Sequence, residues 1–113
     1  MSKLLDYSLD YELLHIKEAE KQALETQGGS KFVFENFITS LATAKYPQGM
    51  KGLNLRIFGR ILEKLDKSTD TIEFETAEFD LLKEFVLSDE ISVLPQQARL
   101  YNYYRRKFEQ INN

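Results

Sequence analysis

Residues 53–67 read LNLRIFGRILEKLDK and form the clearest amphipathic pattern in the chain. Apolar side chains recur every three or four positions, as on one face of an α-helix, while charged side chains occupy the other positions. The expected apolar face comprises Leu55, Phe58, Leu62 and Leu65, flanked by Ile57 and Ile61. Gly59 lies inside this predicted helix, where glycine costs about 1 kcal/mol relative to alanine. We therefore expect another backbone to pack closely against Gly59.

Two helices are predicted before this segment. Residues 9–26 place Leu9, Leu13 and Ile16 at helical spacing, and the glycines that follow are typical of a helix end. Ser30 is a suitable N-cap for a second helix over residues 31–44, because its hydroxyl can accept a free backbone amide. Pro47 lacks an amide proton and ends that helix. The expected core face of the second helix comprises Phe34, Phe37, Ile38 and Leu41.

Two more helices are predicted in the second half of the chain. Thr76 is a suitable N-cap for a helix over residues 77–87, and Pro95 suits the first position of a last helix over residues 95–111. Their expected core residues are Phe79, Leu82, Phe85 and Val86 in the first, and Leu100, Tyr104, Phe108 and Ile111 in the second.

One short strand is predicted over residues 72–75, where apolar and polar side chains alternate. Residues 91–93 are the only other segment in which we find this alternation, so they are its expected partner. The predicted fold is a mainly α, compact bundle of about five short helices with one short two-stranded β pairing, formed by a single domain over residues 1–113.

The composition is that of a soluble globular protein. Hydrophobic residues make up 42% of the 113 residues and charged residues 29%, and no apolar run has the roughly 18–20 residues that a membrane helix requires. The chain has no Cys, which excludes disulfides, thiolate zinc sites, iron–sulfur clusters and a cysteine nucleophile. The N-terminus lacks the pattern of a signal sequence, so a cytoplasmic location without membrane binding is expected.

The residue sets of the common enzyme classes are missing. His15 is the only histidine, and its neighbours are those of an ordinary helix. The glycines match neither a phosphate-binding loop nor a dinucleotide-binding motif. Acidic residues are frequent between residues 66 and 90, but their spacing is not that of a calcium loop, and a solvated acidic surface explains them more simply. We therefore expect no catalytic, cofactor-binding or metal-binding residues, and no enzymatic activity.

The net charge of −3 arises from blocks of opposite sign. Residues 1–30 carry a net charge of −3, residues 31–64 one of +4, residues 66–90 one of −7 and residues 91–113 one of +3. Complementary blocks favour contacts between surfaces, because opposite charges steer two partners together and set their register.

Residues 99–107, RLYNYYRRK, combine cations with tyrosines and form the strongest candidate binding surface. Such a surface fits a protein partner, or phosphates with stacked bases. An alternative is that these arginines contact the acidic block 66–90 of the same chain. The candidate interaction residues are Arg99, Tyr101, Tyr103, Arg105, Arg106 and Lys107, with Arg56 and Arg60 from the helix over residues 53–67.

The eight Phe and six Tyr exceed what the predicted helix faces require. Five of them lie partly outside those faces, which favours an interface slightly over additional cover for a small core. These five aromatic residues are Tyr7, Tyr11, Phe32, Tyr101 and Tyr103.

Residues 50–110 resemble small helical accessory proteins encoded by tailed bacteriophages. The resemblance lies in an arginine-bearing helix, residues 55–65, followed by residues 72–83, IEFETAEFDLLK, as a short acidic strand and a capped helix, and by a final helix. It implies an accessory or assembly role through binding rather than catalysis, and it identifies no functional residues.

Two functions remain open from the sequence. The first is a non-enzymatic protein that binds a protein partner or forms a homo-oligomer. The second is nucleic-acid binding through the C-terminal helix, although a pI near 5.2 is low for a dedicated nucleic-acid binder. A small anionic ligand bound by the same arginines is a third interpretation, for which the sequence contains no pocket signature.

Overall fold

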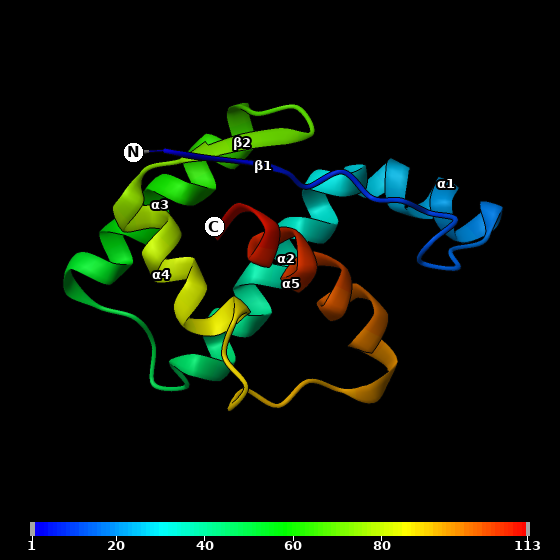
Figure 1. Cartoon of the computed structure of the whole chain (residues 1–113). Coiled ribbons are helices and arrows are strands. Elements are labelled where there is room, and N and C mark those ends of the chain that lie inside the picture. The colour runs from blue at the N-terminus through cyan, green and yellow to red at the C-terminus, as the bar shows by residue number, and fades with distance from the viewer. Residues whose placement is uncertain (1, 113) are drawn as a thin grey trace.

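The computed structural model describes residues 2–112 and has five α-helices and a two-stranded antiparallel sheet (Figure 1). It thereby confirms the predicted mainly helical fold with one short β pairing. The elements are β1 (Lys3–Asp6), α1 (Glu18–Gln27), α2 (Gly29–Lys45), α3 (Gly52–Lys67), β2 (Thr71–Phe74), α4 (Thr76–Val86), a 3₁₀ turn (Pro95–Gln97) and α5 (Ala98–Asn112). Within residues 2–112, no helix is both long and apolar enough to cross a membrane.

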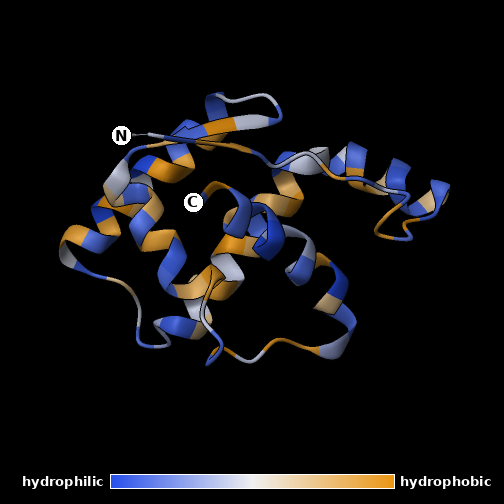
Figure 2. Ribbon diagram, in the orientation of Figure 1, coloured by the Kyte–Doolittle hydropathy of each residue, from blue (hydrophilic) through white to orange (hydrophobic). Residues whose placement is uncertain are grey.

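Helix α2 lies in the middle of the molecule and contacts α1, α3 and α4. Its predicted core face is confirmed, since Phe34, Phe37, Ile38 and Leu41 are all buried. The apolar side of α5 also turns inward: Tyr104 and Phe108 are fully buried, as predicted, while Leu100 and Ile111 are half-buried. Apolar segments of the ribbon accordingly gather where the helices meet (Figure 2).

The helix predicted over residues 53–67 is confirmed as α3, with two differences on its faces. Leu55 is 55% exposed, so the buried stripe runs instead through Ile57, Phe58, Ile61 and Leu65. The close packing expected at Gly59 is wrong, because nothing lies within 4 Å of the place where a side chain would begin there.

The strand β2 was predicted one residue later, and its predicted partner was wrong. It pairs antiparallel with β1, so that Leu5 lies opposite Ile72 and both side chains enter the core. Residues 91–93 lie in the loop before α5. The true partner is about 70 residues away along the chain and has only four residues, which leaves little alternation for a sequence pattern to detect.

Helix α4 begins as expected, but its cap differs from the predicted one. Glu75 is the N-cap and Thr76 is the first helical residue. The carboxylate of Glu78 accepts the backbone amide proton of Glu75 at 2.8 Å, as part of a capping box. The predicted core residues Phe79, Leu82, Phe85 and Val86 are buried.

The first helix begins at Glu18, and the prediction that it starts near residue 9 was wrong. Residues 10–15 form turns in which the carboxylate of Asp10 accepts the amide proton of Leu13, and His15 adopts a positive φ of 59°. A left-handed residue interrupts a right-handed helix. Leu9 and Leu14 are nevertheless buried, while Leu13 is 56% exposed.

Ser30 has a different role from the predicted N-cap. It lies inside α2, and its hydroxyl oxygen accepts the amide proton of Leu9 at 2.9 Å. The residue before α2 is Gly28, whose φ of 127° favours glycine, and a Cβ atom added there would lie only 3.1 Å from the Cβ of Phe32. Ser30 thus fixes the N-terminal segment against α2.

Candidate functional site: a basic cleft beside helix α5

Helix α5 is held against the N-terminal segment by hydrogen bonds to backbone carbonyl oxygens. The hydroxyl of Tyr104 donates to Tyr7 at 3.0 Å, and the hydroxyl of Tyr103 donates to Ser8. The ammonium group of Lys107 donates to Asp6 at 2.7 Å and to Ser8 at 3.3 Å. These bonds fix one side of α5 to the segment that follows β1, and the same segment continues to Leu13 and Leu14.

Tyr104 gives this attachment a pH dependence. Its burial raises the pKa of its hydroxyl above the ordinary value of about 10, so above that pH the unfolded chain releases a proton that the folded protein keeps. The stabilisation is complete below pH ~10 and is lost as the pH rises further. We expect the free energy of unfolding, measured with urea between pH ~8 and ~11, to fall above pH ~10, and to fall less steeply in Tyr104→Phe. Equal slopes in the two proteins would contradict this assignment.

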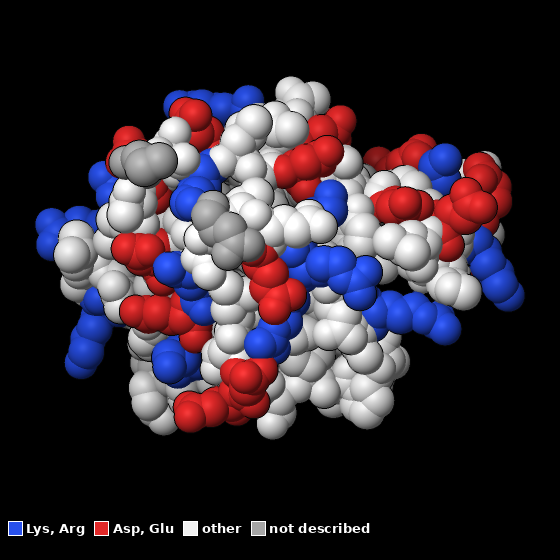
Figure 3. All heavy atoms as spheres, viewed as in Figure 1, with Lys and Arg blue, Asp and Glu red and all other residues white. Residues whose placement is uncertain are grey.

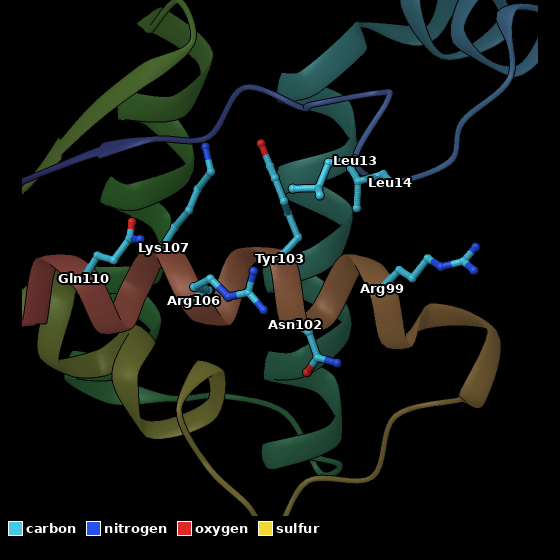
Figure 4. A pocket seen from close by; sticks show the side chains of 8 residues that line it. All are labelled: Leu13, Leu14, Arg99, Asn102, Tyr103, Arg106, Lys107 and Gln110. Atoms are coloured by element: carbon cyan, nitrogen blue, oxygen red, sulfur yellow. The ribbon is translucent and has the colours of Figure 1, made fainter.

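A cleft of about 380 Å³ lies between α5 and residues 13–14 (Figure 4). Tyr103 and Lys107 point from α5 toward the N-terminal segment, and Leu13 lies between the ends of Tyr103 and Arg99 in this view. The lining residues are Leu13, Leu14, Arg99, Asn102, Tyr103, Arg106, Lys107 and Gln110. The cleft therefore combines cationic, amide and apolar side chains.

Arg99 and Arg106 are the cations of this cleft whose guanidinium groups can bind a ligand without giving up another contact within residues 2–112. Both are exposed, and neither forms an ion pair or hydrogen bond with any residue in the range 2–112. They lie seven positions apart on α5, so their Cα atoms are separated by about two helical turns, or about 10 Å. Asn102 is exposed between them.

Arg105 and Tyr101, predicted as interaction residues, instead hold α5 to the end of α4. The guanidinium of Arg105 lies 2.6 Å from a carboxylate oxygen of Asp89 and also donates to the carbonyl oxygen of Leu87. Its hydrogen bond to Asp89 raises the pKa of Arg105 above its usual value. Tyr101 is buried, and its hydroxyl bonds to the carbonyl oxygen of Val86. The alternative contact between C-terminal arginines and the acidic block is thus present for Arg105.

Arg56 and Arg60 lie on α3 and do not line the cleft beside α5. Arg56 is exposed. The guanidinium of Arg60 lies 3.8 Å from Glu78, whose side chain is fully buried and also receives the ammonium group of Lys64 at 2.7 Å. The structure therefore does not join the two α3 arginines to the C-terminal cations in one surface.

The aromatic residues that lie partly outside the predicted helix faces are mostly in the core or packed against it. Tyr7 is fully buried, Tyr101 is 9% exposed, and Tyr103 is half-buried with the Lys107 ammonium 4.8 Å above its ring. Core packing thus accounts for most of these aromatic residues, whereas the sequence had slightly favoured an interface. Phe32 lines a second cleft of about 220 Å³ between α1, α2 and α5, which is mainly apolar.

Sequence reasoning missed the apolar wall of the basic cleft. Leu13 was assigned to a buried helix face, whereas the turn at residues 10–15 leaves it beside α5. Asn102 lies on the outer side of the last helix with Arg99 and Arg106, as the helical spacing predicts, and Gln110 could have been identified by the same spacing.

The arrangement can bind anionic groups next to an apolar side chain. No group of three possible metal-ligating side chains occurs within residues 2–112. Comparison with known proteins adds no assignment: no family model matches the chain, and no match was found among curated proteins or solved structures.

Proposed function

We propose that this protein is a non-enzymatic binding protein that docks an acidic surface of a partner protein on the cleft beside α5. The observation that carries the proposal is that Arg99 and Arg106 have no partner among residues 2–112 and line the same cleft as the exposed Leu13. Charged and apolar groups side by side are typical of protein interfaces, where arginine is enriched. The resemblance to phage accessory proteins and the expected cytoplasmic location are consistent with this role and remain predictions.

A nucleic-acid partner is less well supported. Single strands bind through exposed aromatic rings on which bases stack. Of the two tyrosines predicted as interaction residues, Tyr101 is buried, and Tyr103 is half-buried with the Lys107 ammonium 4.8 Å from its ring centroid, so neither offers a fully exposed ring. Acidic side chains also gather over α1, beyond the basic centre of the same face, and would repel a long polyanion (Figure 3).

A second copy of the chain is another candidate partner. Of the acidic residues between positions 66 and 90, only Glu78 is buried, so a neighbouring molecule would offer an extended acidic surface. Self-association of this kind would weaken with salt, because the charges involved are exposed.

The proposal predicts binding of acidic peptide that depends on two arginines. We expect a fluorescein-labelled polyglutamate peptide to bind the protein at low salt, and the double variant Arg99→Gln/Arg106→Gln to lower that affinity by about tenfold or more. Fluorescence anisotropy measures both, and Arg56→Gln is the control, since it removes an exposed arginine outside the cleft.

Two results would contradict the proposed function. The first is polyglutamate binding that is unchanged in the double variant. The second is tighter binding of a labelled DNA or RNA strand that requires the same two arginines and falls steeply with salt. Sedimentation velocity without peptide, at low and high salt, tests whether the protein forms a homo-oligomer. A monomer under both conditions excludes self-association.

A further inference from the structure

We infer that the cleft beside α5 recognises a short segment of another protein in which two carboxylates flank one apolar side chain. This inference rests on the proposed function and makes it more specific. It adds a spacing between the carboxylates and a requirement for an apolar group, neither of which follows from charge alone.

The spacing comes from the two free arginines. Their positions on α5, seven residues apart, set their Cα atoms about 10 Å apart on one side of the helix. A partner helix lying along α5 meets this spacing with two acidic residues seven positions apart. Each guanidinium can then donate two hydrogen bonds to one carboxylate, which is the arrangement that arginine favours.

The apolar requirement comes from the wall of the cleft between the arginines. Leu13 is 56% exposed and Leu14 is mostly buried, and both line the cleft, so an apolar side chain faces an opening that α5 lines with polar and charged side chains. The volume of about 380 Å³ accommodates one or two side chains of a partner helix whose backbone lies outside the cleft. Asn102 and Gln110 add amide groups that can bond to the partner beside the apolar contact.

The wall is fixed in place before a partner arrives. Tyr103 and Lys107 bind the backbone of Ser8 from α5, and Ser30 binds Leu9 from α2. The segment leading to Leu13 is therefore attached to two helices. A preorganised site loses less conformational freedom on binding, which favours recognition of a short segment.

A second copy of this chain does not meet both requirements with its main acidic block. Within residues 2–112, the large hydrophobic residues that are exposed are Leu4, Leu13, Leu53, Leu55 and Leu94. None of them lies between residues 66 and 90, where the large apolar side chains are buried except for the half-buried Leu87. That block offers carboxylates without a strongly exposed large apolar side chain beside them, so a segment of a different protein is the occupant that we propose.

Three labelled, alanine-based helical peptides test the inference. The first carries two glutamates about seven positions apart with a leucine midway between them on the same face. The second has serine in place of that leucine, and the third has the two glutamates adjacent. We expect the first peptide to bind about fivefold to tenfold more tightly than either of the others, measured by fluorescence anisotropy.

Matched variants connect this preference with the cleft. Leu13→Ser is expected to weaken binding of the leucine peptide about fivefold and to leave the serine peptide unaffected. Leu55→Ser is the control, because Leu55 is 55% exposed, as Leu13 is 56% exposed, and lies outside the cleft. Arg99→Gln and Arg106→Gln should each weaken the leucine peptide about tenfold, and Arg56→Gln should not.

The outcomes separate the two proposals. Equal affinity for the leucine and serine peptides, with both still dependent on Arg99 and Arg106, would overturn the inference and leave the proposed function in place. Binding that needs neither arginine would overturn both. Circular dichroism of each variant confirms that a loss of binding is not a loss of fold.

Discussion

Replacing Phe34 by alanine is expected to lower the free energy of unfolding by about 3–5 kcal/mol, the largest effect of any single substitution that we consider. The side chain of Phe34 is fully buried in the middle of α2. Its ring centroid lies 5.3 Å from that of Tyr7 and 5.1 Å from that of Tyr104. It therefore joins α2 both to the N-terminal segment and to α5.

The loss has two parts, the transfer of the ring from water and the cavity that it leaves. Small domains have free energies of unfolding of about 5–15 kcal/mol, so this loss removes a large part of the stability of the protein. Urea denaturation followed by circular dichroism measures the change. Phe32→Ala is the control on the same helix, since Phe32 is only half-buried, and should cost far less. Equal losses at the two positions would show that Phe34 does not join these elements.

Replacing Lys64 by methionine is expected to lower the free energy of unfolding by about 2–3 kcal/mol, because it leaves a buried carboxylate without its nearest cation. The side chain of Glu78 is fully buried, and one of its oxygens accepts a hydrogen bond from Lys64 at 2.7 Å. The other oxygen has no hydrogen-bond partner within residues 2–112. The side chain of Lys64 is 35% exposed, so we place the effect below that of a fully buried pair.

The double variant Lys64→Met/Glu78→Leu separates the ion pair from its surroundings. Removing both charges takes away the buried carboxylate that has lost its nearest cation, so much of the stability lost in Lys64→Met should return. The capping hydrogen bond that the backbone amide of Glu75 donates to the Glu78 carboxylate is also lost, which limits the recovery by about 1 kcal/mol. A free energy of unfolding that is lower in the double variant than in Lys64→Met would contradict this account of Glu78.

The helices that could be predicted are those whose patterns are long and local. Helices α2, α3 and α4 were predicted to within about two residues at each end, because apolar residues at spacings of three and four are sufficient to define a buried face. The N-terminal segment could not be predicted in this way. Residues 9–17 carry apolar residues at helical spacing, but the turn at Asp10 and the left-handed His15 prevent a helix there.

The candidate site was predicted in part, and for a related reason. The outer side of α5 follows from helical periodicity, so Arg99 and Arg106 were correctly assigned to a surface. Which cations remain free depends on contacts across the fold, such as that of Arg105 with Asp89, and these have no local signature. The same holds for the buried Glu78. Its position in the first turn of α4 follows from the sequence, whereas its burial and its ion pair with Lys64 depend on tertiary contacts.

Chemical-shift mapping by NMR tests most directly whether the cleft beside α5 is the docking surface. The labelled protein is titrated with the peptide that carries two glutamates and a leucine. We predict that the backbone amide signals of residues 99–110 and of Leu13 and Leu14 shift, while those of residues 52–60 on α3 stay in place. Shifts centred on α3, or spread evenly over the chain, would contradict the assignment of this cleft.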